Sequence, residues 1–152
     1  MFPIPPGRYR GGLGVARTTR ALSPIVVNTQ SDRSKCPPWG LEGGGDAAGN
    51  AIAFRIGAQW KTDFPNAKVL VAQLKTGDAW RISSGGGGGY GSPSDRPVED
   101  VREDVCQGYV SVKAAAELYG VIIDPTTYEI DRTATERCRS SSPSLAAKRR
   151  MK

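Results

Sequence analysis

The chain has 152 residues, of which 38% are hydrophobic, 19 are glycine, 11 are proline and none is histidine. This length suits one domain with a modest core, and the glycine and proline content predicts a fold rich in loops and turns. Without histidine, the chain lacks the usual general base of nucleophilic catalysis, and no other convincing catalytic set is present. We therefore assign no catalytic residue.

The net charge of +6 is concentrated at one end of the chain. Residues 137–152 carry six basic side chains and no acid, so residues 1–136 are neutral overall. This distribution gives no single-sign face for nucleic acid, and no apolar run approaches the roughly 18 residues that span a bilayer. We expect no nucleic-acid partner, no membrane partner and a disordered basic tail over residues 138–152.

The cysteines are three in number, at positions 36, 106 and 138, and they form no C-x-x-C motif. The N-terminus has no apolar segment of the kind that directs secretion. A reduced, cytoplasmic protein without a metal site or a cofactor of its own fits these features best.

The first half of the chain predicts short strands joined by turns. Residues 31–50 are rich in glycine, proline, serine and aspartate and predict a long loop. Lys68–Leu74 and Ala79–Ser83 flank Lys75-Thr-Gly-Asp78, a pattern that predicts an antiparallel hairpin with Gly77 at positive φ. The expected strands are 13–20, 25–27, 52–56, 68–74 and 79–83. In the third of these, Ile52, Phe54 and Ile56 alternate with Ala53 and Arg55.

The apolar period then changes to that of helices. Val98, Val101 and Val105 recur at helical spacing, with Pro97 in the first turn, Gly108 as the stop and a solvated acidic face that includes Asp104. A second helix should run from Ser111 to Gly120, followed by a strand over 121–123. A third helix should start at Asp131 or at Thr133, which with Glu136 would form a capping box.

These elements predict an α+β fold in which an antiparallel, β-rich N-terminal portion precedes two or three short helices. The glycine run 85–91 contains G-x-G-x-x-G at positions 86, 88 and 91, but no helix follows directly and no Lys-Ser or Lys-Thr follows. Dinucleotide and P-loop sites are therefore excluded. Ordering its five consecutive glycines costs about 5–10 kcal/mol, so the run is either a flexible joint or a place where the backbone closely approaches a ligand or partner.

Several residues are candidates for contact with a substrate or partner. Arg8 and Arg10 have guanidinium forks that suit phosphate or carboxylate, although alternate arginines on a strand usually face solvent. Trp39, after two prolines, is either a contact residue or a local core plug. The candidate residues are Arg8, Arg10, Ser31, Asp32, Arg33, Trp39, Gly86, Gly88 and Tyr90.

The order of several short motifs resembles the C-terminal part of hydantoinase B/oxoprolinase family subunits, which include N-methylhydantoinase B, 5-oxoprolinase and acetone carboxylase alpha-like proteins. The motifs are Gly7-Arg-Tyr-Arg-Gly-Gly-Leu-Gly14, Ser31-Asp-Arg33, Pro37-Pro-Trp-Gly-Leu41, Leu74-Lys-Thr-Gly-Asp78, Gly86-Gly-Gly-Gly-Tyr-Gly91 and Glu103-Asp-Val-Cys-Gln-Gly-Tyr-Val-Ser111. The resemblance implies a family domain over residues 7–137, with a β part (7–84), a glycine-rich joint (85–91) and a helical part (92–137), after an extended lead-in (1–6).

The resemblance also implies a function for the intact assembly: ATP-dependent hydrolysis of cyclic amides such as hydantoin and 5-oxoproline, or carboxylation of ketones. ATP would bind a hydantoinase A-type partner, and a divalent metal would bind the N-terminal part of the family protein, which is missing here. The chain would then be a truncated product or a separate C-terminal unit, inactive when isolated. The alternative is a non-catalytic remnant or interaction module whose basic tail binds acidic partners.

Overall fold

The computed structural model describes residues 4–141, which form two compact units built from non-consecutive segments. The strand unit comprises residues 13–38 and 48–86. The helical unit takes in the segment up to Gly12, the segment Trp39–Ala47 and the chain from Gly87 onward. The family-domain boundaries expected from sequence stay a prediction, because the compact units describe packing within the chain.

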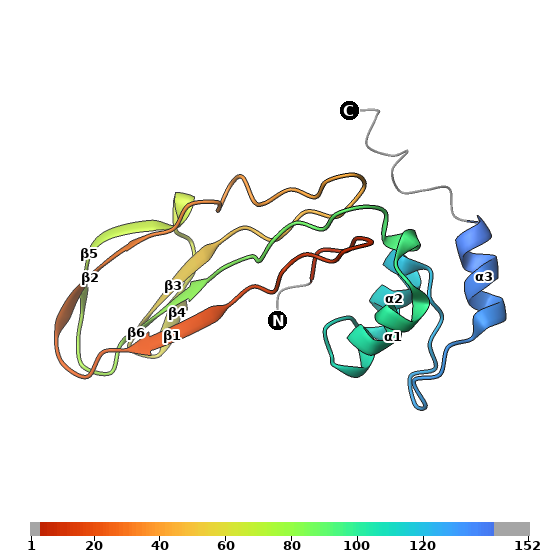
Figure 1. Ribbon diagram of the computed structural model, residues 1–152. Helices are drawn as coiled ribbons and strands as arrows, with labels where there is room; N and C mark the ends of the chain where they lie inside the picture. Colours follow the sequence, from red (N-terminus) through yellow and green to blue (C-terminus); the bar gives the residue numbers. More distant parts are fainter. Residues whose placement is uncertain (1–3, 142–152) are drawn as a thin grey trace. The chain divides into compact units, whose positions relative to one another are not determined.

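The strand unit holds six strands in two antiparallel sheets (Figure 1). Four of them form one sheet in the order β1-β6-β3-β4, and β2 pairs with β5 in the other. The exposed β4 was not predicted, because its three residues show no apolar alternation. The strands are β1 (Ala16–Arg20), β2 (Ile25–Gln30), β3 (Ala51–Ile56), β4 (Gln59–Lys61), β5 (Lys68–Leu74) and β6 (Ala79–Ser83).

The core of the strand unit depends on the alternation predicted for β3. Ile52 and Phe54 are 3% and 2% exposed and pack with Val27 of β2 and Leu74 of β5. The Phe54 ring meets that of Phe64 edge to face, with centroids 5.4 Å apart. One face of β3 therefore packs into the core, and the other faces outward.

The hairpin predicted from β5 and β6 is wrong, although its turn is correct. Leu74 of β5 lies opposite Ile25, whereas Ala79 of β6 lies opposite Arg20 and Arg55, so the two strands belong to different sheets. The Asp78 carboxylate accepts hydrogen bonds from the backbone N–H groups of Gly57 (2.9 Å) and Lys75 (2.8 Å), which lower its pKa. Gly77 adopts φ +94° as expected.

The helical unit contains α1 (Val98–Cys106), α2 (Val112–Tyr119) and α3 (Arg132–Ser141). Buried residues of α1, of α2, of their connection and of the segment after α2 form its core, namely Val101, Val105, Val110, Ala115, Tyr119, Val121 and Ile123. The α+β class with an antiparallel β-rich portion followed by helices is thus confirmed. Short 3-10 turns lie at Pro65–Ala67 and Pro93–Asp95.

The helix ends follow the predicted capping residues. The Ser111 hydroxyl accepts a hydrogen bond from Ala114 N–H (3.1 Å), and Gly120 closes α2 with φ +64°. Of the two starts proposed for α3, Asp131 is the correct one, because its carboxylate accepts from Ala134 N–H (2.9 Å). Residues 121–123 form no strand, only a bridge between Ile123 and Ile130.

The third helix is longer at its C-terminal end than expected. It continues to Ser141, so residues 138–141, assigned to the tail from sequence, are helical. The rest of the predicted tail lies outside the described residues. Within residues 4–141, no helix is long and apolar enough to cross a membrane.

Replacing the central core aromatic tests this description of the strand unit. Phe54→Ala should lower the free energy of unfolding by about 3–5 kcal/mol, because it leaves a cavity between the sheets. The matched control is Ile56→Ala on the same strand, where the side chain is 50% exposed and the loss should stay below about 1 kcal/mol. Urea denaturation measures both, and equal losses would contradict the central position of Phe54 in this core.

Candidate functional site

Three glycine-rich segments of the helical unit, residues 5–12, 39–47 and 87–91, lie against one another and are called here the glycine layer. Tyr9 and Tyr90 exchange two backbone hydrogen bonds of 2.9 Å each. Leu41 N–H donates to the Gly89 carbonyl (2.9 Å), and Gly89 N–H donates to the Gly45 carbonyl (2.9 Å). Segments about 40 to 80 residues apart in sequence are thereby joined through their backbones.

The layer requires glycine because its backbones touch where side chains would begin. A Cβ on Gly44 would overlap the Gly89 carbonyl, and one on Gly88 would overlap the Trp39 carbonyl. A Cβ on Gly89 would likewise meet the carbonyl of Pro6. Close backbone approach therefore occurs at residues 88 and 89, but the approaching group is the chain's own backbone and not the ligand or partner that the sequence suggested.

The glycine layer presents an exposed patch of large side chains, Tyr9, Leu41 and Tyr90, called here the aromatic patch. Their exposed fractions are 61%, 54% and 50%. Both Tyr9 and Leu41 lie opposite Tyr90 in backbone bridges, and the two tyrosine ring centroids are 6.3 Å apart. The Arg8 guanidinium carbon lies 5.7 Å from the Tyr9 ring centre. Such a patch is unusual on a surface that contacts only water.

Trp39, in the same layer, is 59% exposed. It is not the local core plug that the neighbouring prolines suggested. Trp39 does interact with other residues of the structure, although much of it is exposed. The prediction that Trp39 is a contact residue stays open.

A buried carboxylate ties the glycine layer to α1. Asp104 accepts from Arg10 Nε and from Arg96 Nη2, each at 2.9 Å, and its side chain is 7% exposed. The Arg10 guanidinium carbon also lies 5.0 Å from the Tyr109 ring centre, and Arg96 Nη1 donates to the Arg8 carbonyl (3.1 Å). The placement of Asp104 on a solvated face was wrong, because its partners come from elsewhere in the sequence.

Tyr119 of α2 lies close to this charged cluster. It is 1% exposed, and its hydroxyl has no hydrogen-bond partner among the described residues. Burial raises the pKa of Tyr119, and the nearby charge of Arg96 opposes only part of that rise. The phenol is therefore held in its neutral form.

The remaining candidate residues lie in the strand unit. Asp32 is exposed, and its carboxylate lies 3.3 Å from Lys68 Nζ. Arg33 has φ +59°, and its carbonyl accepts from Asn50 N–H (3.1 Å). The structure thus gathers five of the nine candidates in the glycine layer (Arg8, Arg10, Trp39, Gly88 and Tyr90), and places Ser31, Asp32, Arg33 and Gly86 in the other unit. Their contact roles stay predictions.

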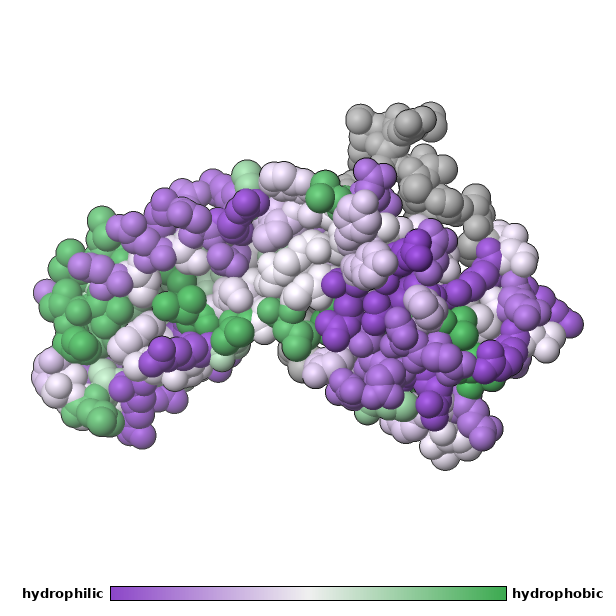
Figure 2. All heavy atoms as spheres, viewed as in Figure 1, coloured by the Kyte–Doolittle hydropathy of each residue, from purple (hydrophilic) through white to green (hydrophobic). Residues whose placement is uncertain are grey.

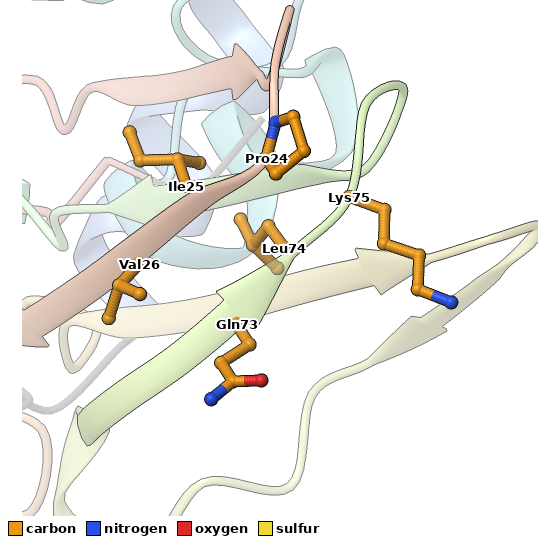
Figure 3. Close-up of a pocket in the computed structure, with 6 residues that line it drawn as sticks. All are labelled: Pro24, Ile25, Val26, Gln73, Leu74 and Lys75. Atoms are coloured by element: carbon orange, nitrogen blue, oxygen red, sulfur yellow. The ribbon is translucent and has the colours of Figure 1, made fainter.

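A shallow pocket of about 420 Å³ lies at one end of the β2–β5 sheet (Figure 3). None of the candidates lines it; its walls are Pro24, Ile25, Val26, Gln73, Leu74 and Lys75. Figure 2 shows apolar side chains gathered over this end of the strand unit. The sequence predicted residues 25–27 only as a strand, since the exposure of Ile25 and Val26 depends on which sheet the strand joins.

The side chains that line the pocket offer few polar or charged groups. Its one charged residue is Lys75, whose ammonium points away from Leu74 in Figure 3. It can hold an apolar group but offers no acid–base pair. Elsewhere in residues 4–141, no group of three or more His, Cys, Asp or Glu side chains is arranged to hold a metal ion.

A sequence profile of the hydantoinase B/oxoprolinase family matches residues 5–93. The chain belongs to this family. It is 34% identical over 136 residues to an uncharacterized protein of Methanocaldococcus jannaschii, covering 88% of this chain and 23% of that protein. It is 29% identical over 134 residues to a putative B-type D-/L-hydantoinase subunit of Pseudomonas sp. strain NS671, covering 88% of this chain and 22% of that protein. The chain thus spans less than a quarter of the length of these curated relatives.

Two solved structures share the fold. The ATP-dependent caprolactamase from Pseudomonas jessenii superposes with a TM-score of 0.74 at 22% identity, covering 93% of this chain and 26% of that one. A nucleotide-free acetone carboxylase superposes with a TM-score of 0.69 at 24% identity, covering 90% of this chain and 23% of that one.

The requirement for glycine in the layer is testable at one position. Gly44→Ala should lower the free energy of unfolding by about 1–3 kcal/mol or more, because the new methyl group overlaps the Gly89 carbonyl. Gly12→Ala is the control, since the nearest atom to its methyl group would be 3.9 Å away, and its effect should stay within about 0.5 kcal/mol. Chemical denaturation followed by circular dichroism compares them; similar effects would refute the close-approach argument.

The buried phenol gives a prediction in alkaline solution. Tyr119→Phe removes a hydroxyl without a hydrogen bond, so at pH 7 stability should change by no more than about 0.5 kcal/mol or should rise. Because the folded-state pKa is raised, the wild-type chain should lose stability as the pH rises above about 10, where the unfolded phenol ionises first.

Unfolding should be measured at pH 7, 9 and 10.5 for wild type and for the variant. The stability of Tyr119→Phe relative to wild type should grow at the highest pH. Tyr128→Phe, at a residue 40% exposed, should show no such growth. A constant difference between Tyr119→Phe and wild type across this range would show that the phenol ionises equally well in both states.

Proposed function

We propose that this chain supplies a packing surface to a hydantoinase B/oxoprolinase-type enzyme, corresponding to the C-terminal part of the family protein. The full assembly would carry out ATP-dependent hydrolysis of a cyclic amide such as hydantoin or 5-oxoproline, or carboxylation of a ketone. The observation that carries the proposal is the aromatic patch on the glycine layer, where Tyr9, Leu41 and Tyr90 are half exposed or more.

The glycine layer suits such a surface because two kinds of contact hold its backbone in place. Its segments are hydrogen-bonded to each other, and Arg10 is fixed on Asp104. A patch on a fixed backbone loses little conformational entropy when it binds, and aromatic side chains are enriched at protein interfaces. The names of two relatives, a putative B-type hydantoinase subunit and the beta subunit of a caprolactamase, support a role within an assembly of several chains.

The chemistry would be supplied by other parts of the assembly. We place the ATP site in a hydantoinase A-type partner, and a divalent metal site in the part of the relatives that this chain does not span. The described residues hold no group of His, Cys, Asp or Glu suited to a metal ion. This chain would contribute positioning, through Arg8, Trp39 and the aromatic patch, and no step of the reaction.

Co-purification tests the proposed surface. The chain should be co-expressed with a hydantoinase A-type protein and with the remaining portion of a related hydantoinase B-type protein, one of them tagged. Tyr9→Ser combined with Tyr90→Ser should reduce recovery of the complex about tenfold, because it removes the apolar contact area while keeping the backbone bridges. Tyr128→Ser, which removes an exposed tyrosine elsewhere in the helical unit, should leave recovery unchanged.

Two results would count against the proposal. One is capture of neither of these partners by the wild-type chain. The other is turnover of hydantoin or 5-oxoproline by the isolated chain with ATP and a divalent metal, since the proposal gives it no catalytic group.

A further inference from the structure

The four-stranded sheet has an outward face whose composition is set by its register. Because Ile52 and Phe54 of β3 point into the core, the residues between them in sequence and their cross-strand partners point outward. One row across this face joins four strands through Arg20, Ala79, Arg55 and Trp60. The adjacent row joins Thr18, Arg81 and Ala53.

This outward face carries three arginines and no acidic residue. Arg20 and Arg81 are exposed, and Arg55 is partly buried. None of the three forms an ion pair with any residue between positions 4 and 141. The nearby Asp78 lies in the turn before β6, where its carboxylate oxygens accept from backbone N–H groups. The Asp78 carboxylate also interacts electrostatically with Arg55, which helps to lower the pKa of Asp78. The charges of Arg20 and Arg81 are offset by no ion pair among residues 4–141.

Two of the three guanidinium groups, those of Arg81 and Arg55, are held in place before any ligand binds. Arg81 lies over the Trp60 ring at 4.7 Å from its centre, and its Nε donates to the Thr18 hydroxyl (2.9 Å). Arg55 lies 6.0 Å from the same ring centre and donates from Nη2 to the Gly77 carbonyl (3.0 Å). Its Nε is buried without a hydrogen-bond partner. Fixed guanidinium forks suit planar carboxylates.

The spacing of the arginines fits a chain of carboxylates better than one small anion. Arg20 and Arg55 are two strands apart in the same row, so their backbones are separated by about 9–10 Å, and Arg81 belongs to the strand between them. Alternate side chains of an extended peptide are about 7 Å apart, which lets successive acidic residues reach different arginines.

We propose that this sheet face, with Arg55 and Arg81 beside Trp60 and with Arg20 on β1 at the other edge of the sheet, binds an acidic segment of a protein partner. The inference does not depend on the proposed function, because it rests on the strand unit alone. A single-stranded nucleic acid is less suited to the face, since the Trp60 ring already stacks with Arg81 and no second aromatic residue on these rows can stack a base.

The test uses the full chain and a fluorescein-labelled peptide of ten glutamates, with binding measured by fluorescence anisotropy at low salt. Arg20→Gln with Arg81→Gln should weaken binding about tenfold. The matched control is Arg17→Gln with Lys61→Gln, which removes two positive charges from exposed positions on the opposite face of β1 and β4. The control pair should weaken binding less than about twofold. Residues 137–152 are unchanged in all variants, so their attraction for the peptide does not affect the comparison.

A second pair of variants guards against loss of folding and separates charge from geometry. Arg20→Lys with Arg81→Lys keeps both charges but removes the forks, and we expect a loss intermediate between wild type and the glutamine pair. Thermal unfolding should be nearly the same for all variants, because the changed side chains are exposed.

Three results would overturn the proposal. The first is no binding by the wild-type chain, and the second is an equal loss in the glutamine pair and the control pair. The third is tighter binding of a ten-residue oligothymidylate that depends on the same two arginines, which would assign the face to nucleic acid.

Discussion

The helical unit depends on close contact between backbones in the glycine layer. Segments around Tyr9, Leu41 and Tyr90 approach so closely that a Cβ on Gly44, Gly88 or Gly89 would overlap a carbonyl oxygen. Ordering a run of five glycines costs about 5–10 kcal/mol, and the hydrogen bonds between the segments offset part of that cost. The ion pairs of Asp104 then hold this layer on α1, so the exposed patch sits on a fixed support.

The two units present surfaces of different chemistry. The helical unit exposes Tyr9, Leu41 and Tyr90, which suit an apolar contact. The outward sheet face of the strand unit instead carries three arginines that form no ion pair with any residue between positions 4 and 141. The chain spans less than a quarter of its relatives from Methanocaldococcus jannaschii and Pseudomonas sp.. Under the proposed function, the two surfaces would contact other parts of the assembly.

Strand pairing shows what the local sequence pattern predicts and what it does not. The sequence around Gly77 and Asp78 specifies a tight turn, and the structure contains it. The same turn carries the chain from the β2–β5 sheet to the four-stranded sheet, because Leu74 packs with Val27 while Ala79 pairs with Arg20 and Arg55. A turn motif determines where the chain reverses, and burial on both sides determines which strands then pair.

The sequence by itself determined the α+β class, the ends of α2, the core face of β3 and the family, because these depend on residues close together in the chain or on motif order. It also indicated that the glycine run stays ordered only if other contacts offset its conformational entropy cost. Only the tertiary structure showed that these contacts come from the chain's own backbone, that Asp104 is buried between Arg10 and Arg96, and that three arginines share one sheet face. These arrangements join residues up to 94 positions apart, and no local pattern records which distant segment will lie against another.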